Sequence, residues 1–149
     1  MNTSDLLANL DAGELTYEAT ALIAWEIGAA SSQEEVASYM YRGGLFPPQA
    51  STKPPNTDDR RPDRKYWDFV KSEIRIFLCT DAKKYRQLWK QINDLQKKST
   101  TAIVGLIAAF LGQLIGAPAT LVSGFVAVCL YAALKLGKEA YCSFSGDEA

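Results

Sequence analysis

Apolar residues recur along this chain at the three- and four-residue spacing of an α-helix. In the segment 63–78 the apolar positions are Trp67, Val70, Ile74, Phe77 and Leu78, with charged residues between them. This spacing places apolar side chains on one side of a helix, where they can face a core. No segment of useful length alternates apolar and polar residues, which is the pattern of a strand. The pattern therefore predicts an all-α fold.

The predicted bundle has about six helices, with boundaries set by caps, glycines and prolines. Ser32 and Glu35 have the spacing of a capping box, and Gly43 follows the predicted end of that helix at Arg42. Only residues 99–101 lie between the predicted helix that ends at residue 98 and the apolar segment that follows, so these two can form one continuous helix. The predicted ranges are 4–11, 15–29, 33–42, 63–78, 81–98, 101–116 and 119–138.

The chain is expected to form a single domain, 1–149, from parts of different composition. The net charge is −6 over residues 1–50 and +6 over 51–98, and residues 99–134 carry no charge. Five of the six prolines lie between residues 47 and 62, where neither a helix nor a central strand can persist. We expect the acidic and basic parts to face each other within the fold. The parts are an acidic helical part at 1–44, a proline-rich loop at 45–62, basic amphipathic helices at 63–98 and an apolar hairpin at 99–140.

Two segments, 101–116 and 119–138, are hydrophobic on all sides and are predicted to form a C-terminal helical hairpin. Gly116 is expected to end the first helix and Pro118 to occupy the first position of the second. A membrane span needs about 20 apolar residues, and the first segment offers about 16. The uncharged turn has nothing to reach the far headgroups, which favours a buried hairpin. The candidate turn and packing residues are Gly105, Gly112, Gln113, Gly116, Pro118, Ser123 and Gly124.

Gln113 is the single amide in the apolar block. If the chain reverses at 117–118, Gln113 lies near Ser123, and Gly105 faces Tyr131. An unpaired buried amide costs about 1–3 kcal/mol. We therefore expect Gln113 to be buried and to bond to Ser123, Thr120 or a nearby backbone group.

The segment 81–98 is predicted to be a basic amphipathic helix. Such a helix either forms one wall of a bundle or lies on a membrane surface. The basic residues that could face a lipid or a partner are Lys83, Lys84, Arg86, Lys90, Lys97 and Lys98.

The chain contains three cysteines, and an odd count without paired spacing is not typical of a disulfide framework. Cys79 and Cys129 are therefore expected to be small core residues. The N-terminal stretch MNTSDLLANLD has neither the basic region nor the long apolar region of a signal peptide. We expect a cytoplasmic protein, which can associate with the inner face of a membrane.

The sequence offers no recognisable catalytic, cofactor-binding or metal-ligating residues. It contains no histidine, which excludes Ser–His and Cys–His pairs and the HExxH zinc motif. It contains neither glycine-rich phosphate-binding motif. The net charge of −1 argues against general binding of nucleic acid. These features favour a protein that is not an enzyme and uses no cofactor.

The predicted function is therefore that of a non-enzymatic helical interaction protein, such as an accessory subunit, an adaptor or an immunity-like partner. It would bind a protein partner or form a homo-oligomer through apolar and charged helical surfaces. The alternative is a membrane-acting effector that inserts its C-terminal hairpin into an anionic bilayer. This alternative resembles colicin-type pore formers in the arrangement of its helices only, because no motif carries the likeness.

Overall fold

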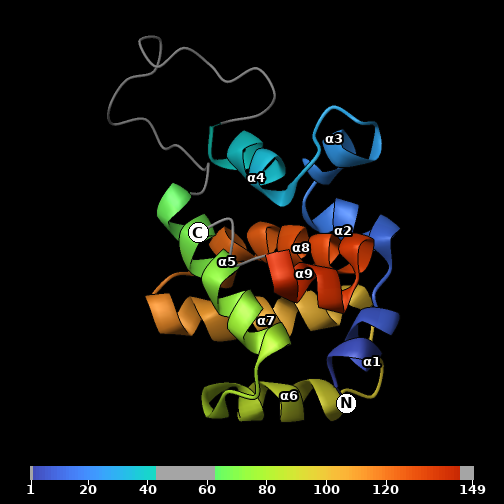
Figure 1. The fold of residues 1–149 in the computed structure, drawn as a ribbon. Helices are drawn as coiled ribbons and strands as arrows, with labels where there is room; N and C mark the ends of the chain where they lie inside the picture. The colour runs from blue at the N-terminus through green and yellow to red at the C-terminus, as the bar shows by residue number, and fades with distance from the viewer. Residues whose placement is uncertain (1, 43–62, 145–149) are drawn as a thin grey trace.

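The computed structural model describes residues 2–42 and 63–144, and within these ranges the fold is all-α, as predicted (Figure 1). The proline-rich loop predicted at 45–62 and the cap at Gly43 lie outside the described residues. Nine α-helices and one 3₁₀ helix, η2, occupy the described part. They are α1 (Thr3–Ala8), α2 (Ala12–Glu18), α3 (Leu22–Glu26), α4 (Gln33–Arg42), α5 (Arg64–Cys79), η2 (Lys83–Tyr85), α6 (Arg86–Asn93), α7 (Thr100–Ile115), α8 (Ala119–Leu136) and α9 (Lys138–Phe144).

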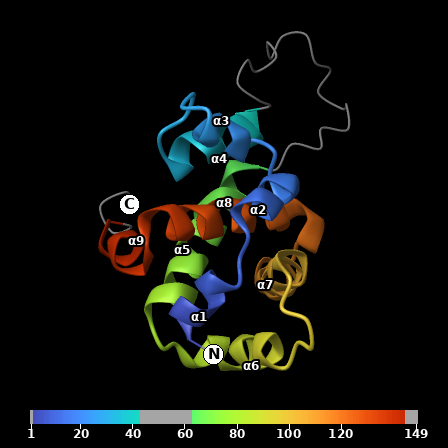
Figure 2. The same cartoon turned by 90° about the vertical axis from the view of Figure 1, so that its right-hand side faces the viewer.

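Helix α8 lies at the centre of the fold (Figures 1 and 2). Residues 125–133 are buried without interruption, and none is more than 6% exposed. A helix that is apolar all round must be covered on all sides, and α8 contacts α1, α2, α4, α5, α7 and α9. Each of these helices keeps another side in contact with water, so α8 organises the bundle.

Helices α4 and α5 match the sequence prediction. Ser32 caps α4, since its hydroxyl accepts a hydrogen bond from the Glu35 backbone N–H at 3.2 Å. The Glu35 carboxylate bonds to the Ser31 hydroxyl at 2.7 Å. Asp63 caps α5 by accepting from the Lys65 backbone N–H at 3.1 Å. The five apolar residues predicted to form the buried side of α5 are at most 2% exposed.

The single helix predicted at 15–29 is wrong, because the chain forms α2 and α3 with a break between them. Asp11 caps α2 from outside, so Gly13 lies inside this helix and does not interrupt it. Ala19 ends α2 in an extended conformation, with φ −141° and ψ 93°. The helical spacing persists through the break, since Leu15, Ala19 and Leu22 are all buried. Packing of α2 on α8 overrides the local preference for a longer helix.

The helix predicted at 81–98 is also shorter than expected and does not run into the apolar segment. It consists of η2 followed by α6, which ends at Asn93. Ser99 then begins α7 by accepting a hydrogen bond from the Ala102 backbone N–H at 3.1 Å. A serine cap of this kind requires a non-helical backbone at the capping residue, so the two helices are separate.

The last predicted helix, 119–138, ends earlier than expected. Gly137 has φ +86° and ψ 153°, a conformation that only glycine adopts readily. The chain therefore leaves α8 at Leu136 and starts α9 at Lys138. Helix α9 packs against α8 and α5 and buries Tyr141.

The expectation that the cysteines form no disulfide is wrong. Cys79, at the end of α5, is bonded to Cys142 of α9, with a Cα–Cα distance of 5.7 Å. The two residues are 63 positions apart in the sequence, and the packing of α9 against α5 brings them together. Cys129, in the middle of α8, is a buried core residue outside this disulfide, as the sequence predicted.

Among the described residues, one helix is long and apolar enough to cross a membrane by length and composition. This helix is α8, whose 18 residues have a mean hydropathy of 1.8, and 56% of them are buried inside the fold. Helix α7 is apolar but shorter, with 16 residues. A buried core helix has the same composition as a membrane span, so composition alone does not distinguish them.

We expect replacement of both bonded cysteines, Cys79→Ser with Cys142→Ser, to lower the free energy of unfolding by about 4 kcal/mol. The bond closes a long loop, 63 residues in sequence separation, and so restricts the unfolded chain. Urea titration followed by tryptophan fluorescence would measure the loss. Reductant should bring the wild type to the level of the double variant and leave the variant unchanged. Equal urea midpoints for oxidised and reduced wild type would contradict this account.

Candidate interaction surface

The water-facing side of α7 carries no charged residue. Six residues form this side, which we call the outer face of α7. Four of them are exposed and recur every fourth residue, and the other two are half-buried. The exposed residues are Thr101, Gly105, Ala109 and Gln113, and the half-buried residues are Ala102 and Leu106. Leu114, near the end of the helix, is 48% exposed.

The inner side of α7 fixes which residues point outward. Ile103, Ile107 and Leu111 are fully buried, and they hold this side against the core. The start of the helix is tied to the segment before α2, since the Thr100 hydroxyl accepts from the Asp11 backbone N–H at 2.8 Å. These contacts set the rotation of α7 about its own axis, and the outer face follows from them.

Three of the predicted turn residues come together between α7 and α8. Gly116 ends α7 in the left-handed conformation, with φ +73°. Gly112 is required by the turn, because a Cβ there would lie 2.5 Å from the Ala117 carbonyl oxygen. The Ala117 N–H donates to the Gly112 carbonyl at 2.8 Å. Pro118 is the N-cap of α8 and not its first helical residue, which is one position from the expectation.

The prediction that Gln113 is buried and paired with Ser123 is wrong. Gln113 is exposed, while Ser123 is half-buried. The expected pairing followed from counting residues across the turn, and it ignored the rotation of α7 about its axis. That rotation turns Gly112 inward and Gln113 outward.

Gly105 does not face Tyr131, in contrast to the prediction. A Cβ at Gly105 would meet no atom within 4 Å. The Tyr131 ring packs instead against Trp25, with ring centroids 5.3 Å apart. Gly124 lies under α4, where a Cβ would be 2.7 Å from the Met40 methyl carbon. Gly124 therefore lets α4 approach α8, whereas nothing within the described fold requires a glycine at position 105.

The basic residues of 83–98 lie on η2, on α6 and in the segment between α6 and α7. The apolar residues of η2 and α6 face the core. Tyr85, Leu88 and Ile92 form this buried side, at most 1% exposed. Lys98 is half-buried and donates to the Leu95 carbonyl at 2.9 Å. The Lys84 ammonium bonds to Glu73 at 2.6 Å. The exposed basic residues are Lys83, Lys84, Arg86, Lys90 and Lys97.

Glu73 connects η2 to α5 by accepting from two donors. Besides Lys84, the Tyr85 hydroxyl donates to the same carboxylate oxygen. Burial raises the pKa of the Tyr85 hydroxyl well above its ordinary value, and the hydrogen bond and negative charge of Glu73 raise it further. The Tyr85 ring also packs 5.4 Å from Phe110 of α7. Tyr85 therefore joins η2, α5 and α7.

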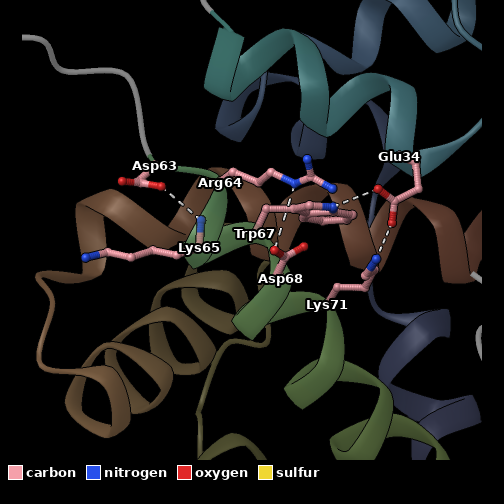
Figure 3. A network of polar contacts seen from close by, with 7 residues as sticks. All are labelled: Glu34, Asp63, Arg64, Lys65, Trp67, Asp68 and Lys71. Atoms are coloured by element: carbon pink, nitrogen blue, oxygen red, sulfur yellow. Dashed lines mark hydrogen bonds and ion pairs between the residues drawn. The ribbon is translucent and has the colours of Figure 1, made fainter. Parts of the chain in front are cut away.

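A second polar cluster joins α4 to α5 (Figure 3). The Trp67 indole N–H donates to the Glu34 carboxylate at 3.0 Å, and the Lys71 ammonium bonds to its other oxygen. Among the ion pairs that the described residues form, Glu34–Lys71 joins the acidic part to the basic part. The expectation that these parts face each other thus holds at this contact. The cluster is fully engaged in holding two helices together.

A cavity of about 520 Å³ lies beside the disulfide. It contains two cations, Arg86 and Lys138, and one carboxylate, Asp81, with the Trp89 ring in its wall. These side chains provide no nucleophile with an adjacent base. Within residues 2–42 and 63–144, no three Asp, Glu, Cys or His side chains are placed to hold a metal ion.

Other apolar side chains are exposed on α2 and at α3. Tyr17 is 85% exposed, and Ile27, immediately after α3, is 71% exposed. Ile23, four positions before Ile27, is 48% exposed. Charged residues such as Glu18 and Glu26 interrupt this region. The outer face of α7 is different because it stays uncharged over a whole helix.

The sequence contains a signal for this face in the spacing of its small and polar residues. Thr101, Gly105, Ala109 and Gln113 are among the least apolar residues of their segment and recur every four positions. That spacing marks one side of a helix.

Comparison of the chain with protein-family models, with curated proteins and with solved structures gives no match.

We expect Gly105→Ala and Gly112→Ala to change stability in opposite directions. Gly105→Ala should raise the free energy of unfolding by about 0.5–1 kcal/mol, because its site has open space and alanine favours a helix. Gly112→Ala should lower it by about 1–3 kcal/mol, because the added methyl group meets backbone. Urea unfolding of the two variants provides matched measurements. A stabilising Gly112→Ala would show that this turn is assigned incorrectly.

We expect Tyr85 to make the fold sensitive to alkaline pH. The folded chain holds the hydroxyl proton, whereas the unfolded chain releases it near pH 10. The unfolded state is therefore favoured increasingly as pH rises above that value. Tyr85→Phe should lose about 1 kcal/mol at pH 7 with the hydrogen bond, and its stability should then fall less steeply above pH 10. Urea midpoints from pH 7 to 11 would show this, with Tyr17→Phe at an exposed site as the control. Parallel profiles for wild type and Tyr85→Phe would contradict the assignment.

Proposed function

We propose that this chain is a non-enzymatic helical protein that acts by binding another macromolecule through the outer face of α7. The observation that supports this is an exposed helix side without a charged residue. The water-facing side of a helix in a soluble bundle is normally polar or charged. Depletion of charged residues is a compositional mark of the centre of a protein interface.

We also propose that α7 and α8 act together as one apolar hairpin. The short turn at Gly116, the close packing of the two helices and the burial of residues 125–133 support this arrangement. In this proposal α8 is permanent core and α7 is the part that a partner reaches. The hairpin then has one structural side and one binding side.

The basic residues of η2 and α6 would orient the partner. Lys83 and Lys90 are exposed on a segment that packs against α7. Charges at the rim of an interface steer association and restrict the choice of partner more than they add affinity. A binding surface with an uncharged centre and a charged rim has the composition common in protein interfaces.

A membrane-acting role is a second candidate, which the length and hydropathy of α8 favour. In this case the hairpin would leave the bundle and enter an anionic bilayer. The burial of α8 opposes this, because five helices besides α7 would have to separate from it first. The binding role requires no such opening.

The sequence favours a cytoplasmic location for this chain, and disulfides are rare in the cytoplasm. A cytoplasmic chain would carry Cys79 and Cys142 as thiols, and an oxidising compartment would preserve the bond between them. The redox state of this pair in the cell thus reports the compartment.

A photo-crosslinking amino acid in place of Ala109 tests the binding role. We expect covalent adducts with another macromolecule in cells that express the chain, because Ala109 lies at the centre of the outer face. The same amino acid in place of Ser72, exposed on α5, is the control and should give none. Absence of adducts at both positions would reject the proposed function. Lipid adducts at 109, together with flotation of the chain on anionic vesicles, would support the membrane role instead.

A further inference from the structure

The outer face of α7 lies between two flanks of opposite charge. Viewed nearly along α7, helix α2 lies on one side of it and α6 on the other (Figure 2). Both helices contact α7. Residues 11–18 carry three acids, Asp11, Glu14 and Glu18, and no base. Residues 83–93 carry four bases and no acid. Lys84 is paired with Glu73 of α5 and Arg86 lines the cavity beside the disulfide, so Lys83 and Lys90 supply the positive charge of this flank.

Gly105 is at the middle of this face, and the fold itself gives no reason for a glycine there. A Cβ at Gly112 would meet backbone and one at Gly124 would displace the end of the Met40 side chain, whereas Gly105 has no neighbour within 4 Å. A glycine inside a helix costs about 1 kcal/mol relative to alanine. A backbone that approaches α7 closely from outside the chain would account for Gly105.

We propose that the outer face of α7 is the contact between two copies of this chain. The two copies are related by a two-fold axis that lies between them and runs parallel to α7. This inference rests on the proposed function and names its partner. In such a dimer the same surface serves both copies, so the surface has to be complementary to itself. An uncharged helix between an acidic flank and a basic flank meets this condition.

The charges decide the direction of the axis. With the axis along α7, the acidic α2 of each copy lies opposite the basic α6 of the other copy. With the axis across α7, α6 would oppose α6 and α2 would oppose α2. Like charges brought together oppose association, and opposite charges promote it. The flanks therefore select the arrangement in which the two α7 helices run parallel.

The same arrangement gives the exposed Gln113 a partner. With the axis along α7, Gln113 of one copy lies opposite Gln113 of the other. A glutamine amide has both donors and an acceptor, so two of them can bond to each other. Gly105 lies opposite its own counterpart as well, where the absence of a side chain allows the helices to approach.

Light scattering on the full chain after size-exclusion chromatography tests the dimer. The expected mass is twice the 16.4 kDa of one chain, over concentrations from about 1 to about 100 μM. Gly105→Arg should raise the dissociation constant by at least about tenfold. Its circular dichroism should match that of wild type, because the site has open space for a side chain. Ser72→Arg, at an exposed position on α5, is the control and should dimerise as wild type does.

Two measurements test the direction of the axis. A Gln113→Cys variant should form a covalent dimer through residue 113 under mild oxidation, since the two copies of this residue are opposite each other. Increasing salt should weaken the wild-type dimer, because opposite charges are screened. Reversal of the acids with Glu14→Lys and Glu18→Lys should weaken it as well. A dimer that salt strengthens, and that does not crosslink at 113, would overturn the proposed axis.

The outcomes separate this inference from the proposed function. A wild-type chain that stays monomeric at the highest concentration overturns the dimer. The proposed function survives that result if residue 109 still crosslinks to another macromolecule. A dimer that Gly105→Arg does not weaken places the contact elsewhere and overturns the inference. Monomers that bind anionic vesicles, and lose this binding with Gly105→Arg, would assign the face to a bilayer.

Discussion

The burial of α8 is the constraint on which the rest of the structure depends. Nine consecutive residues, 125–133, have no polar side to give to water, so every direction around this helix needs a cover. The short N-terminal helices, α5 and α9 supply that cover together with α7. Helix α7 itself keeps one side in water.

Small residues in the central helix set how closely its neighbours approach. Gly124 lets the Met40 side chain of α4 reach the α8 backbone, and Ala127, Ala132 and Ala133 are fully buried or nearly so. Aromatic residues fill the wider spaces, such as Trp67 against Phe125 at 5.6 Å between ring centroids. The core is therefore built from close backbone approaches and a few large rings, which is how interiors reach dense packing.

The parts of the fold that the sequence predicted well are those whose signals are local. The start of α4 follows from the serine at position 32, and the buried side of α5 follows from residue spacing alone. The break at Ala19 depends on contacts with α8, about a hundred residues later, so the local sequence pattern does not predict it. The orientation of Gln113 depends on the rotation of α7, which Ile103, Ile107 and Leu111 set together. Cys79 and Cys142 meet through the packing of α9 on α5, and the spacing of the cysteines in the sequence does not predict this contact.

The covalent link between Cys79 and Cys142 also gives the chain a topology. Residues 79–142 form a closed ring that contains η2, α6, α7 and α8, together with most of α9 up to the bonded residue, and the helices α1–α4 precede this ring. The two most apolar helices cannot be drawn out as a free arm, because both ends of their segment remain joined to the end of α5. The N-terminal helices, in contrast, are held on α8 by non-covalent contacts. Any opening of the fold that uncovers α8 while the bond is intact would begin by lifting this N-terminal cover from a ring that stays closed.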